Sequence, residues 1–191
     1  MKRLILASKS PRRKKLLQQL GLKFKVVDSG LEEKINPKLS PSQLAMKLSQ
    51  EKARVVAKRY KNSIIIAADT FITLGKTIIG KPKDKKDAKR ILKTLSGRMH
   101  PIITGFTVMD SNTGKSSSKF VVSKVWIKKL AEKEINEYVA TGEPMDKAGA
   151  YGIQERGSVF VKKIDGDYFN VVGLPLRTLT EELKKFGVKI L

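Results

Sequence analysis

Two adjacent arginines, Arg12 and Arg13, stand in the first turn of a segment that has the pattern of a helix. Ser10 suits the capping position and Pro11 the first helical position, so we expect the helix to begin here. A helix N-terminus carries partial positive charge, which disfavours a nearby cation by about 0.3–1 kcal/mol. An anion bound by the free N–H groups, both guanidinium groups and the hydroxyls of Ser8 and Ser10 would explain the two arginines. The alternative is that both are solvated and belong to a basic helix face.

A carboxylate, Asp69, directly follows the apolar run Ile64–Ala68. Such a run, rich in β-branched residues, predicts a buried strand, and functional side chains gather at strand ends in α/β sheets. An aspartate at this place can bind a metal ion or accept a proton. The alternative is an aspartate that caps a turn. It is disfavoured because Thr70–Ile72 continues the apolar pattern.

Other positions carry weaker signals. Lys81 stands between Gly80 and Pro82, in a sequence that predicts a loop presenting this lysine. Residues 142–152 are small or charged and predict a long loop, and long loops usually carry function. His100 lies on a predicted strand, where a structural role is favoured over a role as ligand.

The composition excludes several kinds of chemistry. The chain of 191 residues has no Cys and one His, which excludes disulfides, thiolate catalysis and zinc centres built from several histidines. The longest purely apolar run, Ile64–Ala68, is far below the ~18 residues that span a bilayer. The apolar stretch Leu4–Ala7 is too short for a secretory signal, so we expect a cytoplasmic protein without a membrane partner.

The charge is strongly positive. Lys and Arg number 40 against 18 Asp and Glu, which gives a net charge of +22. Residues 1–62 hold 17 basic and 4 acidic side chains, so this segment carries +13 of the total. The excess favours an anionic partner, such as a phosphorylated small molecule, a nucleic acid or an anionic membrane. A Lys-rich solvated surface is the alternative, and it is favoured for most of the lysines.

These side chains must be positioned by intermixed helices and strands. Caps and apolar spacing predict helices over residues 11–20, 41–59, 84–95, 132–140 and 175–186. β-Branched or alternating runs predict strands over residues 3–7, 24–27, 63–74, 99–110 and 120–127.

Two connections complete the expected fold. Residues 159–164 and 168–172 are expected to pair as a hairpin around Gly166, and Ser116–Ser118 to lie in a hairpin loop. The alternation of helices with hairpins favours an α/β fold with a mixed sheet and flanking helices over a purely parallel sheet.

Seven short blocks occur in order along the chain: Leu6–Arg13, Glu51–Ala53, Ala68–Thr70, Gly80–Pro82, Ser96–His100, Asp146–Gln154 and Val172–Leu176. Together they resemble the Maf (septum-formation-inhibitor-like) nucleoside triphosphate pyrophosphatases. The block Asp146–Gln154 resembles the branch of the family that hydrolyses dTTP and UTP. One departure is Ala131, where relatives usually carry a Ser or Thr that caps the next helix.

The resemblance implies a single Maf-like domain over residues 1–191, with the Maf/ITPase-like fold of two lobes around a central cleft, and commonly a homodimer. It implies hydrolysis of a nucleoside triphosphate, with pyrimidines preferred, to the monophosphate and pyrophosphate. A divalent cation, Mg²⁺ or Mn²⁺, is the expected cofactor, because oxygen ligands and phosphates suit these ions.

The resemblance also implies roles for single residues. Asp69 is the expected catalytic residue, and Glu33 and Asp69 are the expected metal ligands. Base selection is expected at Thr70 and Gln154, with Arg12. The full set of expected substrate-binding residues is Ser8, Arg12, Arg13, Lys52, Thr70, Lys81, Lys147 and Gln154.

Two other functions compete with this one. A basic nucleic-acid-binding protein would account for the charge, but aromatic residues make up only 6% of the chain, which leaves little for base stacking. A family member without catalysis, acting in division arrest through partners, is disfavoured by the intact Asp69 and arginines.

Overall fold

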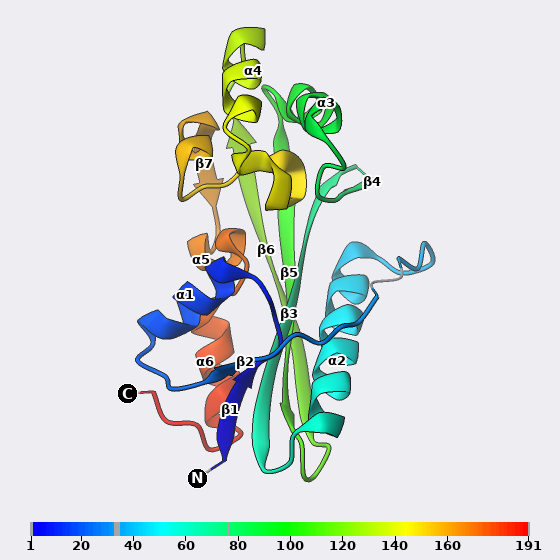
Figure 1. Ribbon diagram of the computed structural model, residues 1–191, viewed down its shortest axis with the longest axis vertical. Coiled ribbons are helices and arrows are strands. Elements are labelled where there is room, and N and C mark those ends of the chain that lie inside the picture. The colour runs from blue at the N-terminus through cyan, green and yellow to red at the C-terminus, as the bar shows by residue number, and fades with distance from the viewer. Residues whose placement is uncertain (1, 33–34, 76, 191) are drawn as a thin grey trace. The chain divides into compact units, whose positions relative to one another are not determined.

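The computed structural model describes residues 2–32, 35–75 and 77–190, and it confirms the expected mixed α/β fold (Figure 1). Seven strands form one sheet in the order β2-β1-β3-β5-β6-β7, with β4 paired to β3 outside this order. The strands are β1 Arg3–Leu6, β2 Lys25–Val26, β3 Ser63–Leu74, β4 Thr77–Ile79, β5 Met99–Asp110, β6 Ser116–Ile127 and β7 Val161–Asp165.

The α-helices of the described residues are α1 Pro11–Gln19, α2 Pro41–Arg59, α3 Lys85–Leu95, α4 Glu132–Ala140, α5 Tyr168–Val172 and α6 Leu176–Lys184. All of them except α5 lie close to their predicted positions. Three short 3₁₀ helices fall in and after the predicted long loop: η1 Glu143–Asp146, η2 Ala148–Ala150 and η3 Arg156–Phe160.

The chain divides into two compact units, as two lobes would require. Unit 1 consists of Met1–Asp69, Thr104–Val121 and Gly173–Leu191, and unit 2 of Thr70–Ile103 and Val122–Val172. Strands β3, β5 and β6 each contribute residues to both units.

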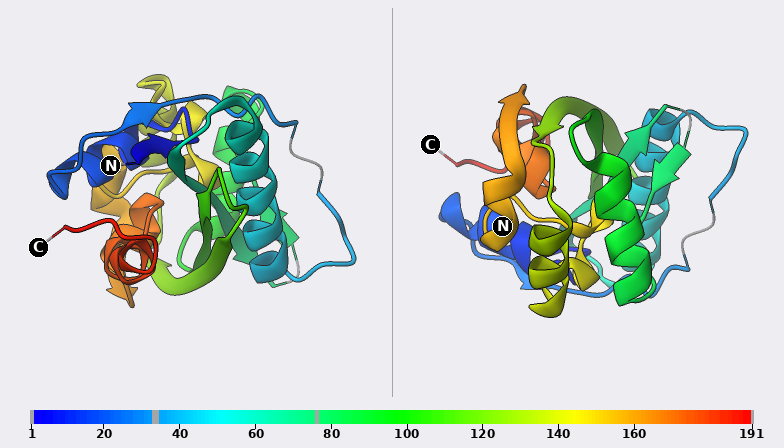
Figure 2. Two further views of the ribbon diagram at one scale, coloured as in Figure 1. Left: turned by 90° about the horizontal axis from the view of Figure 1, so that it is seen from below. Right: turned by 90° about the horizontal axis from the view of Figure 1, so that it is seen from above.

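Unit 1 is built on parallel strands. β1 pairs in parallel with β2 and with β3, and Leu6 lies opposite Ile66. On one face of these strands, Ala53 and Val56 of α2 pack against Ile5 and Ile65. Figure 2 shows α2 on one face of the unit 1 strands and α1 and α6 on the other. Unit 1 therefore has the helix-covered parallel arrangement in which functional groups gather at the carboxyl ends of strands.

The helix α2 begins where its sequence predicts. Ser40 Oγ accepts a hydrogen bond from Gln43 N at 3.3 Å, and Gln43 Oε1 accepts one from Ser40 N at 2.9 Å. This capping box and Pro41 at the first position fix the start of the helix. Leu44 and Leu48 are buried one turn apart, so the apolar stripe predicted for this helix faces the sheet.

A hydroxyl chain under α2 corrects the predicted position of Ser116–Ser118. These residues belong to β6, not to a loop, and the turn before them is closed by the bond from Asp110 N to Lys115 O. The reason is Ser118, whose Oγ lies 2.8 Å from Thr107 Oγ1 on β5. Thr107 Oγ1 in turn lies 2.8 Å from Ser49 Oγ on α2. The partners of these hydroxyls are remote in sequence, so the serine run alone looked like a loop.

Unit 2 has its own core, formed by α3, α4 and the strands. Figure 1 shows α3 and α4 side by side, and Leu92, Leu95, Ile135 and Val139 from these helices are buried with Val125 of β6. The rings of Tyr138 and Phe160 meet edge to face with centroids 4.9 Å apart. This core supports the 3₁₀ segments that follow α4.

The predicted hairpin around Gly166 is wrong. Val161–Asp165 forms β7, which pairs antiparallel with β6, whereas Tyr168–Val172 is the helix α5. Asp167 Oδ1 accepts a hydrogen bond from Asn170 N at 3.1 Å and so favours a helical turn here. The buried Asn170 side chain then donates to Ile102 O at 3.2 Å and to Ser123 Oγ at 2.9 Å. A run of five residues that is apolar except for Asn170 fits a strand or a helix, and the polar contacts of Asn170 favour the helix.

Gly105 generates a first prediction about stability. A Cβ added there would lie 2.4 Å from the carbonyl carbon of Ala45 and 2.5 Å from Met46 N, both in the backbone of α2. Gly105→Ala should therefore push α2 off the sheet and lower the free energy of unfolding by about 1–3 kcal/mol. Gly80→Ala is the control, because nothing lies within 4 Å of its added Cβ. Equal unfolding midpoints of the two variants in urea would show that α2 does not need this close approach.

Ala131 generates a second prediction. It occupies the N-cap of α4 with extended backbone, and Glu134 Oε2 accepts a hydrogen bond from Ala131 N at 2.9 Å. Half of a capping box is thus present, and Ala131→Ser would complete it by adding the hydroxyl acceptor. The melting temperature should rise by an amount that corresponds to roughly 0.5–2 kcal/mol, and Ala131→Val should give no gain. A serine variant that melts no higher than the wild type would contradict the assigned cap.

Candidate functional site

Asp69 is paired with a buried lysine in unit 1. Lys52 Nζ donates a hydrogen bond to Asp69 Oδ2 at 2.9 Å, and each side chain is only 9% exposed. Lys52 reaches the carboxylate because it lies on the buried face of α2, one turn after Leu48 and Ser49. Removing either partner would take a counter-charge away from the buried charge that remains, so each side chain helps to hold the other in place.

The first turn of α1 forms a second polar cluster in unit 1. Ser10 Oγ accepts a hydrogen bond from Arg13 N at 3.4 Å, which confirms the predicted N-cap. Ser8 Oγ accepts from Ser10 N at 3.2 Å and from Arg13 Nη1 at 3.3 Å. Arg13 Nε donates to Gly173 O at 2.8 Å. Both serine oxygens thus fix the start of the helix, and a hydroxyl that accepts a hydrogen bond still has a proton to donate to an anion.

These two clusters lie at the same edge of the unit 1 sheet. Ala7 N donates to Ile66 O at 2.7 Å, directly after the paired residues Leu6 and Ile66. The chain then enters Ser8 on one strand and, three residues beyond Ile66, reaches Asp69 on the other. Since β1 and β3 are parallel, Ser8 and the arginines follow the carboxyl end of β1, and Asp69 lies on β3 just beyond the residues that pair with β1.

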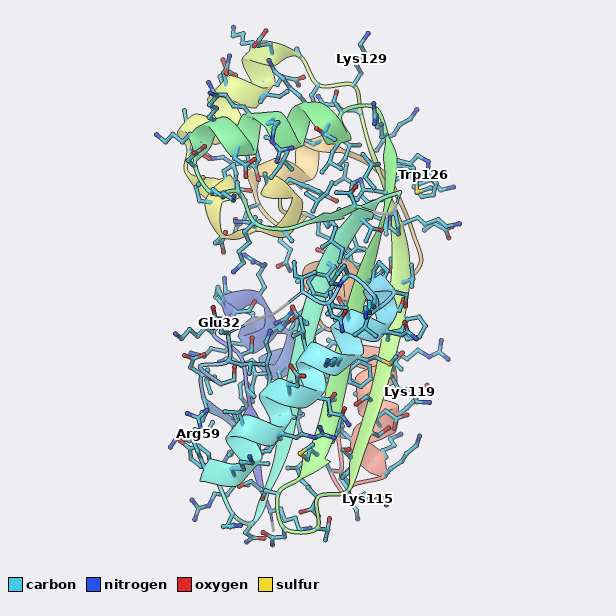
Figure 3. All side chains as sticks on the ribbon, turned by 90° about the vertical axis from the view of Figure 1, so that its right-hand side faces the viewer. Glu32, Arg59, Lys115, Lys119, Trp126 and Lys129 are labelled. Carbon is cyan, nitrogen blue, oxygen red and sulfur yellow. The ribbon has the colours of Figure 1, made fainter. Side chains whose placement is uncertain are left out.

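The segment after β2 is tied to α2. Arg59 Nη2 donates to Asp28 O at 2.6 Å and to Ser29 O at 3.1 Å. Lys9 Nζ lies 2.7 Å from Asp28 Oδ2, and the hydrogen bond from Lys9 is the main cause that lowers the pKa of Asp28. Figure 3 labels Arg59 on α2, Glu32 in the segment between β2 and α2, and Lys115 and Lys119 at β6. Glu33, the second expected metal ligand, lies outside the described residues.

Arg12 lies on α1 in unit 1, and the remaining expected residues that the structure describes belong to unit 2. Thr70 is half-buried on β3, directly after Asp69, and Lys81 and Gln154 are exposed. Lys81 lies between β4 and α3, as expected of a lysine presented by a loop. Gly149 N donates to Gly80 O at 3.0 Å, so the blocks that contain Lys81 and Gln154 are joined through the backbone.

Lys147 is buried, unlike Lys81, the other lysine of unit 2 that is expected to bind the substrate. Its Nζ donates to Glu143 O and to Asp146 Oδ1, both at 2.8 Å, and lies 3.0 Å from Glu155 Oε2. These residues line a surface depression of 820 Å³ that also includes Arg156. Sequence reasoning assigned Lys147 to the substrate and missed its three protein partners.

Tyr138 and Glu143 are further polar residues that the sequence did not single out. The Tyr138 hydroxyl donates to Glu143 Oε1 at 2.8 Å, and burial, followed by this contact with Glu143, raises the pKa of Tyr138. Glu143 also accepts hydrogen bonds from Arg156 N and Gly157 N, both at 3.1 Å. Glu143 and Gly157 are 14 residues apart, and no periodicity in the sequence indicates that they are in contact.

His100 is structural, as favoured from the sequence. Its Nε2 lies 2.7 Å from the Tyr151 hydroxyl, and the two rings meet edge to face. Burial lowers the pKa of His100 to about 4, so the ring is neutral at pH 7. Among the described residues, His100 Nδ1 has no hydrogen-bond partner. This neutral ring anchors Tyr151, three residues before Gln154.

The carboxylates set a limit on how a metal ion can bind. Within the described residues, no three His, Asp or Glu side chains are close enough to hold an ion together. Asp69 alone nevertheless suits Mg²⁺, which proteins bind through one or two carboxylates while waters and substrate phosphates complete the shell.

The helices of the described part of the chain are all too short or too polar to cross a membrane.

Comparisons with known proteins agree with these features. The family described as Maf-like protein matches residues 3–186. A protein of Alkaliphilus metalliredigens named dTTP/UTP pyrophosphatase is 52% identical over 193 residues, which cover 100% of both chains. Proteins with the same name from Alkaliphilus oremlandii and Methanosarcina barkeri are 50% and 48% identical and cover 100% of this chain and 100% and 97% of their own.

Among solved structures, the Ham1 protein of Staphylococcus aureus is 13% identical, with a TM-score of 0.42 over 66% of this chain and 72% of its own. This similarity is too low to carry an argument. The match to residues 3–186 and the full-length relatives decide the matter: the chain belongs to the Maf-like protein family.

Proposed function

We propose that the protein hydrolyses UTP and dTTP to the nucleoside monophosphate and pyrophosphate. The observation that carries this proposal is the buried Lys52–Asp69 pair, which lies at the same sheet edge as the arginine-bearing start of α1. A carboxylate next to several cations is what water attack on a polyphosphate requires. The names of the full-length relatives support both the reaction and the pyrimidine substrates.

In this proposal the phosphates are bound by cations and by hydroxyl groups. Arg12, Arg13 and Ser8 of unit 1 offer guanidinium and hydroxyl donors beside the positive end of α1. Lys52 and Lys81 add two ammonium groups. As the bond between the α-phosphorus and the bridging oxygen breaks, negative charge grows on the departing pyrophosphate, and these cations stabilise it.

Asp69 orients the attacking water and accepts its proton. Lys52 donates to Oδ2 and so fixes the direction of the carboxylate toward the reacting water. The water oxygen forms a bond to the α-phosphorus, its proton passes to Asp69, and pyrophosphate leaves. A free aspartate is a weak base, with a pKa near ~3.9. A divalent cation, Mg²⁺ or Mn²⁺, held by Asp69 and Glu33 would supply charge neutralisation at the phosphates and make the water more acidic.

Base selection is assigned to Thr70 and Gln154, with Arg12. Gln154 is exposed and carries an amide that both donates and accepts hydrogen bonds, as the edge of a uracil or thymine base requires. Lys147 was also expected to bind substrate, but its ammonium contacts Glu143, Asp146 and Glu155. As part of the same proposal, the protein is a single functional domain, a homodimer and a cytoplasmic enzyme.

A nucleotide panel tests the proposal directly. The purified protein should release pyrophosphate from UTP and dTTP when Mg²⁺ is present, faster than from ATP or GTP. The rival hypothesis of a nucleic-acid-binding protein predicts no release and a salt-dependent affinity for DNA or RNA instead. A protein that releases no pyrophosphate from any of the nucleotides would refute the enzymatic proposal.

Asp69→Asn tests the catalytic carboxylate. The substitution keeps the size of the side chain and an oxygen for Lys52, but it removes the base and the anionic ligand. Turnover of UTP should fall by at least ~10²-fold, the usual scale for a lost base. Binding of UTP, measured by calorimetry, should persist. A folded variant with turnover near that of the wild type would remove Asp69 from the mechanism.

Arg13→Lys and Gln154→Ala separate phosphate binding from base reading. Arg13→Lys keeps the charge but loses the fork that binds phosphate oxygens, so kcat/KM should fall by a similar factor for every nucleotide. Gln154→Ala should narrow the preference for UTP and dTTP over GTP by several-fold to tenfold, because a lost hydrogen bond costs ~0.5–1.5 kcal/mol or more. The measurement is kcat/KM for UTP, dTTP, CTP, ATP and GTP. A uniform loss in Gln154→Ala would make Gln154 a structural residue.

A further inference from the structure

The buried ammonium of Lys147 is already matched with acceptors. A lysine ammonium has three N–H donors, and Lys147 Nζ donates two hydrogen bonds, to Glu143 O and to Asp146 Oδ1, both at 2.8 Å. It also forms an ion pair with Glu155 Oε2 at 3.0 Å. The Lys147 side chain is only 7% exposed. The contacts of this ammonium are with residues 143–155, in its own segment of the chain.

The segment 152–157 is held at both ends by neighbouring groups. At its start, Gly152 N donates to the Tyr138 hydroxyl at 3.3 Å. At its end, Arg156 N and Gly157 N donate to the two oxygens of Glu143, each at 3.1 Å. Between these anchors, Glu155 contacts Lys147. We name the group of Tyr138, Glu143, Lys147 and Glu155 the Lys147 clamp.

Two glycines allow the clamp to close tightly. A Cβ at Gly152 would lie 2.7 Å from Lys147 Cε, and a Cβ at Gly157 would lie 2.6 Å from the Tyr138 hydroxyl. Ile153 packs partly buried against the unit 2 core. Gln154 is therefore an exposed side chain on a short stretch whose neighbours on both sides are fixed.

We propose that Lys147 is a positioning residue that acts through Glu155 to hold Gln154 in the orientation that selects the base. This inference rests on the proposed function, and it replaces the expectation that Lys147 binds the substrate directly. Glu155 adjoins Gln154 in the chain, so its ion pair with the buried ammonium of Lys147 limits the backbone angles available to Gln154. Base discrimination depends on the direction of an amide, and a mobile amide would make poorer hydrogen bonds with the preferred base.

Asp146 provides a matched control for Glu155. Both carboxylates contact Lys147 Nζ, and their side chains are 54% and 53% exposed, so neither substitution opens a cavity in the core. Only Glu155 is adjacent to Gln154. Glu155→Ala should lower the ratio of kcat/KM for UTP to that for GTP by several-fold, whereas Asp146→Ala should leave this ratio unchanged. Glu155→Gln, which keeps an acceptor for Lys147, should retain most of the preference.

Two further measurements separate positioning from a general loss of structure. In the Gln154→Ala background, Glu155→Ala should lower the ratio no further, because a residue that acts through Gln154 has no effect once the amide is gone. Amide hydrogen exchange at residues 153–157 should speed up in Glu155→Ala and not in Asp146→Ala. Lys147→Met should reproduce the loss of base preference seen in Glu155→Ala.

The outcomes distinguish failure of this inference from failure of the proposed function. A wild-type protein without pyrophosphatase activity, or a uniform loss in Gln154→Ala, refutes the function assigned to the protein or to Gln154. If the wild type and Gln154→Ala behave as proposed, two results would overturn the positioning role. One is an unchanged ratio of kcat/KM for UTP to that for GTP in Glu155→Ala. The other is a ratio that falls further in the double variant Gln154→Ala/Glu155→Ala than in Gln154→Ala alone. A rise in KM by the same factor for all nucleotides in Lys147→Met, with the ratio intact, would show that Lys147 binds the triphosphate.

Discussion

The ion pair between Lys52 and Asp69 is the constraint on which unit 1 is organised. Two opposite charges, each 9% exposed, are tolerated inside a protein only when they remain in contact. That contact requires α2 to lie close to the sheet, which Gly105 permits by having no Cβ. The hydroxyl contact between Ser49 and Thr107 holds the same helix one turn before Lys52. The geometry of Asp69, the carboxylate that we propose as the base, is therefore set in part by Gly105 and Thr107 of β5 and by Ser49 of α2.

Local signals explain why much of this arrangement could be predicted from the sequence. Ser10-Pro11 and Ser40-Pro41 fix two helix starts through caps that involve only neighbouring residues. The run before Asp69 identified the central strand because β-branched residues leave few alternatives. Asp69 and the arginine pair attracted attention because each is costly where it stands unless it has a partner or a ligand. Such mismatches between a residue and its local position are visible without any structure.

The rest depended on partners that are remote in the chain. Tyr168–Val172 is a helix because Asn170 reaches Ile102 and Ser123, and these bonds span 68 and 47 residues. The same holds for the Lys147 clamp. A sequence displays the charge of Lys147 but not its contacts with Glu143, Asp146 and Glu155, which only the fold brings together.

The division of the chain into units has a consequence for how the protein is made. Unit 1 is discontinuous. The first of its three pieces ends at residue 69, the second begins at residue 104 and the third begins at residue 173. Arg13 is bonded to Gly173, the first residue of the last piece, and the buried Glu182 on that piece accepts a hydrogen bond from Ser117. During synthesis, all segments of unit 2 leave the ribosome before the last piece of unit 1 does. The hydrogen bond from Arg13 to Gly173 can therefore form only after residues more than 150 positions later have been synthesised. By then, every residue of the unit 2 core has already been made.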